Sequence, residues 1–321
     1  MANATDSQIV EIVPDGDIIL VVGPDKTKLR VKSMLLMAAS KPFSVMLGPN
    51  WKEGHDMRHR NGPFELLLPD DDATALEIIC SVIHFQNDRI QQTLPASDVL
   101  AVAIAADKYD CLNSLQFASE VWLRELEVKP RDLMLLTAAA YLFQNPQAFK
   151  EHTASLVLNH HGSYLSLFGE DTGDILPWEI LHLLEEQRGF ARLQLADILI
   201  RGIRFGFCYS GCGWTGNGYT YAYMKKLENE HLFPAQFSHM PISKALEKAE
   251  IMSDPRLWGQ RKACTKARDH TVPGLQPNVN VGRGQLNKLI GLCLECVRGG
   301  SRSSICKEPS HTSHRLHGRF V

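Results

Sequence analysis

The spacing of apolar residues in the first third of the chain predicts a small sheet followed by helices. Residues 18–22 are five consecutive apolar residues, a run too short for a helix and rich in β-branched side chains, so a buried strand is predicted. The Gly-Pro-Asp-Lys sequence at 23–26 is typical of a turn, and the alternation over 29–32 predicts a half-buried return strand. A third strand is predicted at 64–69.

Apolar residues at helical spacing predict short helices between and after these strands. Ser33 is expected to cap the first of them, and Asp70, Asp71 and Asp72 offer an N-cap for a helix that carries an apolar face through Ile83. Such patterns occur at 34–38, 43–47, 75–83, 99–104 and 115–123.

The middle of the chain, residues 130–206, is helical in pattern throughout. Apolar faces at 133–143 and 149–158 are separated by Pro146, and a turn-rich stretch ends at Pro177. Further apolar groups lie at 180–184 and 193–203, and the second of these is expected to form a last helix.

The order of particular residues in residues 15–126 resembles the BTB/POZ family of protein-interaction modules. Asp17 lies at the head of the first strand, Val31-Lys32-Ser33 precedes a Leu-rich helix, and Ser40-x-x-Phe43 follows it. The phrase at 106–111, Ala-Asp-Lys-Tyr-Asp-Cys, with Trp-Leu at 122–123, resembles BTB proteins of filamentous fungi. The resemblance implies an α+β fold, a small sheet with helical hairpins, used for self-association or for docking a partner.

Three residues bear on self-association, which the resemblance implies through the first strand and early helices. Lys32 stands where the family usually has His, and Ser33 where many dimeric members carry a basic residue. The acidic–basic pairing seen near Asp17 in many dimers is therefore missing, so both a homodimer and a monomer remain open.

Trp51 and Glu53 occupy the place where some BTB adaptors carry an apolar-x-Glu motif that docks the cullin scaffold of ubiquitin ligases. An exposed aromatic anchor beside a carboxylate is a typical pair at a protein interface. The alternative is an ordinary loop tryptophan that covers the edge of the core.

Charge and cysteine are unevenly distributed, and the composition changes near residue 206. From Pro255 to Val321 there are twelve Lys or Arg against three acidic residues, whereas the whole chain has a formal net charge of −2. The basic end could neutralise phosphates, but it has no interleaved aromatic residues, so a solvated surface is favoured over a nucleic-acid interface. No signal-peptide pattern and no apolar run of about 18 residues is present, so we expect no membrane partner and a cytoplasmic or nuclear location.

Cysteine and histidine form four ordered pairs in the last third, and this pattern favours metal binding. The pairs alternate between Cys-Cys and Cys-His, and eight ligands suit two tetrahedral structural zinc ions, each with three thiolates and one imidazole. The alternative is that these are unrelated thiols in a loose tail. The spacing does not tell which pairs share an ion, and His314 or His317 could replace His311. The residues are Cys208, Cys212, Cys264, His270, Cys293, Cys296, Cys306 and His311.

These observations predict an N-terminal tail (1–14), a BTB/POZ domain (15–126), a helical extension (130–206) and a Cys/His-rich basic region (207–321). The predicted function is that of an adaptor for protein partners. The alternatives are a zinc-stabilised, nucleic-acid-associated regulator and a substrate adaptor of a cullin ubiquitin ligase. Catalytic signatures such as Gly-x-Ser-x-Gly, His-Glu-x-x-His and the phosphate-binding loop are missing, so an enzyme is not expected.

Overall fold

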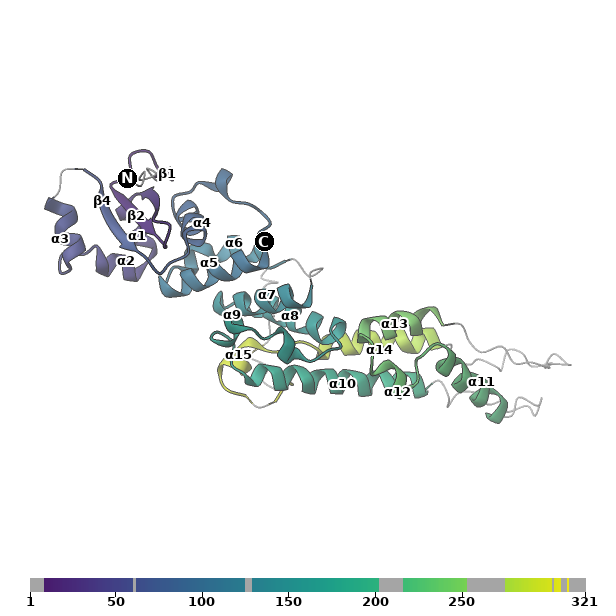
Figure 1. The fold of residues 1–321 in the computed structure, drawn as a ribbon. Helices are drawn as coiled ribbons and strands as arrows, with labels where there is room; N and C mark the ends of the chain where they lie inside the picture. The colour runs from purple at the N-terminus through teal and green to yellow at the C-terminus, as the bar shows by residue number, and fades with distance from the viewer. Residues whose placement is uncertain are drawn as a thin grey trace, which may run out of the picture. The chain divides into compact units, whose positions relative to one another are not determined.

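The structure is a computed structural model, and it describes residues 9–59, 62–124, 129–201, 216–252, 275–301, 303–306 and 311. Within these residues the fold is mixed α/β, with one small four-stranded sheet and a majority of helices (Figure 1). The chain divides into two compact units, Met1–Ala148 and Phe149–Val321, called unit 1 and unit 2 below.

The sheet of unit 1 is built around the strand that the apolar run predicts. Strand β2 (Ile18–Val22) is buried along its whole length and lies between β3 (Thr27–Val31), antiparallel to it, and β4 (Phe64–Leu68), parallel to it. A short strand β1 (Ile9–Glu11), within the predicted N-terminal tail, adds to β3 in parallel, so the order is β1-β3-β2-β4. Gly23, with φ 71°, opens the β2–β3 turn in a conformation that favours glycine.

Most helices of unit 1 follow the predicted apolar faces, but α3 (Lys52–His59) forms in a polar stretch where the sequence indicated no helix. Asp72 is the N-cap of α4 and accepts a hydrogen bond from the N–H of Ala75 at 2.7 Å, while Ser40 caps α2 through the N–H of Phe43 at 3.2 Å. The helices are α1 (Ser33–Ala39), α2 (Lys41–Met46), α3 (Lys52–His59), α4 (Ala73–Ile83), α5 (Ala96–Lys108), α6 (Gln116–Trp122) and α7 (Pro130–Leu142), with single turns η1 (Asn87–Arg89) and η2 (Leu112–Leu115).

Ser33 does not cap α1 as the sequence predicted. It is the first residue of the helix, the N-cap position is Lys32, and the side chain of Lys32 makes no capping hydrogen bond. Asp17 instead accepts hydrogen bonds from the Ser33 N–H at 2.8 Å and from the Ser33 hydroxyl at 2.6 Å. The carboxylate of Asp17, the residue immediately before β2, therefore satisfies this free N–H, and the local sequence around Ser33 does not reveal that contact.

Buried side chains of the sheet and of α4 and α5 form the core of unit 1, and α7 packs closely against α5. This packing places α7 with unit 1, so the first compact unit extends past the range 15–126 expected from the sequence. The remaining helices of the expected extension, 130–206, belong to the same unit as the Cys/His-rich region.

Unit 2 contains a bundle in which α14 (Leu275–Leu289) packs against α10 (Glu179–Arg201) and α13 (Ile242–Ile251) (Figure 1). A Cβ at Gly282 would lie 2.3 Å from the side chain of Ile198, so any larger residue here would force that side chain to move. Its other elements are α8 (Pro146–Asn159), which begins at the division, η3 (Tyr164–Leu167), α9 (Glu170–Gly173), α11 (Gly216–Asn229), α12 (Pro234–Phe237) and α15 (Leu294–Arg298).

Helix α10 joins the two apolar groups that the sequence analysis treated separately. It runs for 23 residues through Gly189, where an added Cβ would meet no atom within 4 Å. Packing of its buried face against neighbouring helices outweighs the helix-weakening effect of one glycine. Across the described part of the chain, no helix is both long and apolar enough to cross a membrane.

Candidate metal centre

Four of the predicted ligands converge near the end of unit 2. The sulfur atoms of Cys293, Cys296 and Cys306 and a ring nitrogen of His311 all lie within 4.8 Å of one another. The Sγ of Cys296 is 3.5 Å from the Sγ of Cys306 and 3.4 Å from the Nδ1 of His311. Cys306 Sγ is 3.8 Å from the same nitrogen, so this group could bind a metal ion.

Local structure explains how a short segment presents two of the thiols. Cys293 is the N-cap residue of α15, and Cys296 follows within the first turn of that helix. Gly299 and Gly300 come directly after α15, and the N–H of Ser301 then bonds to the carbonyl of Cys296 at 2.9 Å. Two cysteines three residues apart on one tight turn can reach the same ion.

Three of the distances are close to those between ligands of a tetrahedral ion. With Zn–S bonds of about 2.3 Å and tetrahedral angles, two thiolates lie about 3.8 Å apart, and a thiolate lies slightly closer to an imidazole nitrogen. The observed separations of 3.4 to 3.8 Å among Cys296, Cys306 and His311 fall near these values. Three thiolates and one imidazole fill all four positions of a structural site.

The surroundings of the thiols favour their protonated form when they stand alone. Burial raises the pKa of Cys293 to about 12, and the Glu295 carboxylate, which accepts a hydrogen bond from this thiol at 3.2 Å, acts in the same direction. Burial also raises the pKa of Cys296. A cation that binds here must therefore displace protons, as metal ions do at thiol sites.

The other four predicted ligands lie outside the described residues. These are Cys208, Cys212, Cys264 and His270, and the alternative histidines His314 and His317 lie outside them too. Two zinc sites were predicted, and the described residues contain one four-residue group that could form such a site. The two remaining cysteines, Cys80 and Cys111, are buried in unit 1, where burial raises the pKa of each to about 12.

The predicted partner-binding residues of unit 1 fall into two groups. Asp17 and Ser33 bond to each other, and the ammonium of Lys32 lies 2.8 Å from the carboxylate of Asp15, so all three are engaged within the chain. Trp51 precedes α3 with 53 % of its surface exposed, and Glu53, which is half-buried, lies in the first turn of that helix. Of the five predicted residues, Trp51 is therefore the one best placed to meet a partner, with Glu53 close to it in the chain.

Two buried polar side chains next to the cysteine loops were not found from the sequence. Gln187 of α10 bonds to the backbone of Gly291 and Ser304, and Thr153 of α8 accepts a hydrogen bond from the N–H of Leu292 at 2.9 Å. The two backbone partners of Gln187 lie 104 and 117 positions after it in the chain. The sequence shows only that Gln187 is a polar residue in the middle of an apolar helix face. That does not indicate which backbone groups its side chain contacts.

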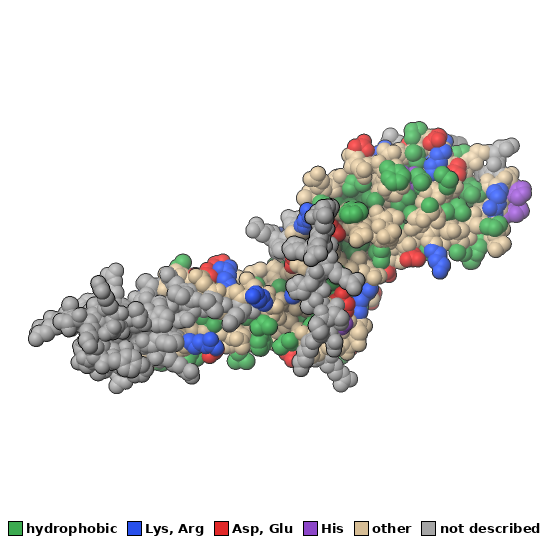
Figure 2. Space-filling model, turned by 180° about the vertical axis from the view of Figure 1, so that it is seen from behind, with side chains coloured by type: hydrophobic (Ala, Val, Ile, Leu, Met, Phe, Trp, Pro, Cys, Tyr) green, Lys and Arg blue, Asp and Glu red, His purple; other side chains and the backbone are tan. Residues whose placement is uncertain are grey.

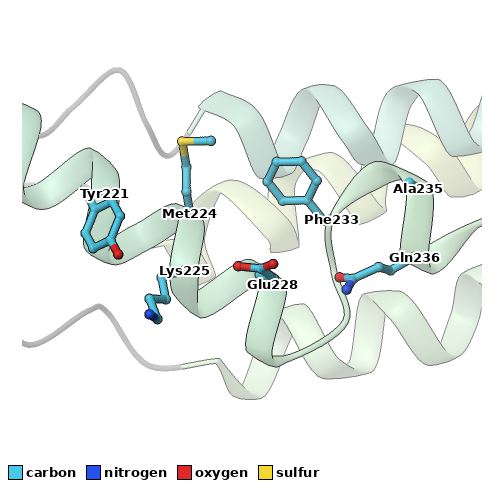
Figure 3. Close-up of a pocket in the computed structure, with 7 residues that line it drawn as sticks. All are labelled: Tyr221, Met224, Lys225, Glu228, Phe233, Ala235 and Gln236. Carbon is cyan, nitrogen blue, oxygen red and sulfur yellow. The ribbon is translucent and has the colours of Figure 1, made fainter.

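A hollow of about 430 Å³ lies elsewhere in unit 2, between α11 and α12 (Figure 3). Tyr221, Met224 and Phe233 supply its apolar wall, and Lys225, Glu228 and Gln236 supply polar groups. These lining residues include no cysteine, serine or histidine.

Comparison of the chain with models of known protein families gives no match, and neither does comparison with curated protein sequences. The metal centre and the contacts around it are therefore the firmest basis for a function.

Proposed function

We propose that this protein is an interaction adaptor whose unit 1 is a BTB/POZ-like docking module and whose unit 2 is held together by structural zinc. The observation that carries the proposal is the convergence of Cys293, Cys296, Cys306 and His311 within 4.8 Å. A shell filled by four protein ligands leaves no position for a substrate, which favours a structural role over a catalytic one.

The docking role of unit 1 is supported by its fold and by its surface. A hairpin, three short helices, a strand parallel to β2 and then further helices are in keeping with the strands-then-helices order that the BTB resemblance implies. Figure 2 shows hydrophobic side chains in several places on one face of this unit. Trp51, Met34 and Phe117 are each more than half exposed, and exposed aromatic and methionine side chains are typical contributors to protein interfaces.

Trp51 and Glu53 are the proposed contact for a cullin-type scaffold, the partner class implied by the resemblance. An exposed indole followed two residues later by a carboxylate offers an anchor and an orienting charge. Self-association receives less support, since Asp17, Lys32 and Ser33 are already paired within the unit.

Among the described residues, no observation specifically supports the nucleic-acid alternative. Arg283, one of the described basic residues of the last third, lies 2.6 Å from the carboxylate of Glu250. A cation neutralised within the chain is less available for a phosphate.

The metal part of the proposal is tested by elemental analysis of full-length protein purified without added metal. We expect zinc in the preparation and its loss, together with a lower melting temperature of unit 2, on treatment with excess chelator. Folded protein that contains no zinc would overturn this part.

The docking part is tested with purified cullin scaffold and full-length protein. Trp51→Ala should weaken binding by about 2 kcal/mol or more if Trp51 is an anchor. Trp178→Ala is the matched control, since Trp178 is an exposed tryptophan of unit 2. Equal binding by wild type and the Trp51 variant contradicts the assignment, and sedimentation of the same samples reports whether the chain is a monomer or a dimer.

A further inference from the structure

We propose that Gln187 is a positioning residue of the metal centre. Its side chain links the loop before Cys293 to the loop before Cys306 and so sets the distance between them. The inference rests on the proposed zinc centre. It adds that metal affinity depends on a side chain of α10 that lies more than one hundred residues before the ligands in sequence.

The amide of Gln187 holds both loops at once. Its Oε1 accepts a hydrogen bond from the N–H of Gly291 at 2.9 Å, and its Nε2 donates to the carbonyls of Ser304 at 2.7 Å and Gly291 at 3.3 Å. Gln187 is 2 % exposed, so these bonds are shielded from water. Both donor hydrogens and the acceptor of the side chain are therefore used in joining the loops.

The two attachment points occupy equivalent places relative to the ligands. Gly291 is two residues before Cys293, and Ser304 is two residues before Cys306. A side chain that fixes both backbones so close to two ligands limits where their sulfur atoms can move. Loop positions that are set before the ion arrives reduce the ordering cost of binding, as outer contacts do at other metal sites.

Further contacts fasten the first loop to α8 and the second loop to α10. On the first loop, the N–H of Leu292 donates to the Thr153 hydroxyl at 2.9 Å. Gly291 has φ 105°, and a Cβ there would lie 2.6 Å from the backbone of Lys150, so the loop can approach α8 only with glycine at this point. On the second loop, Glu186 accepts a hydrogen bond from the N–H of Ser304 at 3.1 Å.

The alternative is that Gln187 supports the fold of unit 2 without any effect on the ligands. The two roles differ in what they change. A residue that only supports the fold lowers the stability of metal-free and metal-loaded protein alike, and leaves the affinity of folded protein for metal unchanged. A positioning residue lowers that affinity.

The test uses Gln187→Met in the full-length chain, because methionine keeps the volume and removes all three hydrogen bonds. We expect the zinc affinity, measured by competition with a chromophoric chelator, to fall about 10- to 100-fold. Thermal melting with and without metal is recorded on the same samples, and the gap between the two should shrink. Cobalt bound in place of zinc should keep its thiolate charge-transfer bands, since the four ligands are intact.

The matched control is Gln194→Met on the same helix, about two turns further on, where the side chain is half-buried. Its zinc affinity should equal that of the wild type. Thr153→Val is a second variant that keeps its shape and removes one loop contact, so the test survives if Gln187→Met does not fold. It should lower the affinity in the same direction by a smaller factor.

The outcomes separate the inference from the proposal beneath it. Wild-type protein that binds zinc while Gln187→Met and Thr153→Val bind it equally tightly overturns the positioning role alone. Wild-type protein that binds neither zinc nor cobalt overturns the metal centre, and the inference with it.

Discussion

The two units reach a buried, ordered interior by different physical routes. In unit 1 the central strand β2 is entirely buried between two strands, and the buried Ser33 bonds to the carboxylate of Asp17. In unit 2 the segment after Ile290 is rich in glycine, serine and cysteine and contains all four residues of the cluster, and hydrogen bonds hold it on α8 and α10. Unit 1 should therefore fold from its apolar pattern alone, while the proposed function requires an ion for unit 2.

The largest expected difference between the units follows removal of the metal. Cys296→Ser should abolish tight zinc binding at the cluster, and structural zinc sites contribute apparent binding free energies of about 10–16 kcal/mol in small peptides. We expect the melting transition of unit 2 to be lost or strongly lowered, while a fragment of residues 1–148 melts cooperatively in excess chelator. Calorimetry with metal analysis measures both.

Cys111→Ala is the control for that experiment, because Cys111 is a buried cysteine of unit 1. It should leave the zinc content unchanged and alter only the stability of unit 1. A fragment 1–148 without a cooperative transition would contradict the independence of unit 1.

A core substitution should show the reverse pattern. Leu20 has no exposed surface and lies opposite both Leu29 and Leu66 in the sheet. Leu20→Ala should destabilise unit 1 by about 2–5 kcal/mol through lost burial and the remaining cavity. Denaturant unfolding of the full chain gives the value, and zinc content should not change. Loss of zinc in this variant would show that the two units depend on one another.

Acid should weaken unit 1 in two steps. Burial lowers the pKa of His84, whose Nε2 accepts a hydrogen bond from the Lys32 N–H at 2.9 Å. As the pH falls, His84 therefore binds a proton in the unfolded state before it does so in the folded state. The stability that is present above pH 6.5 is lost as the pH falls toward the lowered pKa of His84. Burial acts to raise the pKa of Asp17, but the two Ser33 hydrogen bonds outweigh it and the net pKa is lowered, so a second loss begins below about pH 3.8.

Denaturant unfolding of the 1–148 fragment between pH 8 and pH 3 measures both steps. His84→Gln keeps an acceptor for Lys32 and should remove the first step only. An unchanged profile above pH 5 in that variant would mean that another group titrates there.

The smallest effect is expected at the surface of the sheet. The ammonium of Lys28 lies 2.9 Å from the carboxylate of Glu65, and both side chains are partly exposed. Glu65→Gln should cost at most about 1 kcal/mol, and less at high salt, because solvent screens such pairs. Unfolding curves at low and high salt check this, and a loss above about 2 kcal/mol would contradict it.

The sequence predicted well those parts of the fold in which the signal is local. The buried run at 18–22, the turn at Gly23 and the Asp72 cap each combine a distinctive composition with short-range geometry, and all three are confirmed. Cysteine spacing likewise indicated a metal site, since Cys293 and Cys296 are close in the chain. Whether unit 1 belongs to the BTB/POZ family stays a prediction.

What the sequence did not reveal depends on partners far away in the chain. Ser33 resembles a cap, but the carboxylate of Asp17 reaches it across the first strand pair. Gln187 resembles an ordinary polar interruption, and its role depends on loops that follow more than one hundred residues later. Cys306 and His311 lie closer in the chain to Cys293 and Cys296, but the spacing alone did not show that these four residues form one group.

The Gln187 contacts also bear on the order in which the chain folds. They close loops of 104 and 117 residues, whereas the Lys32–His84 bond of unit 1 spans 52. The entropy lost on closing a flexible loop grows slowly with its length, by about 0.6 kcal/mol per doubling, but distant contacts slow the search for the native state. Unit 1 should thus be folded before the C-terminal segment docks on α10. Cys293, Cys296 and Cys306 should remain exposed to solvent until that last docking step.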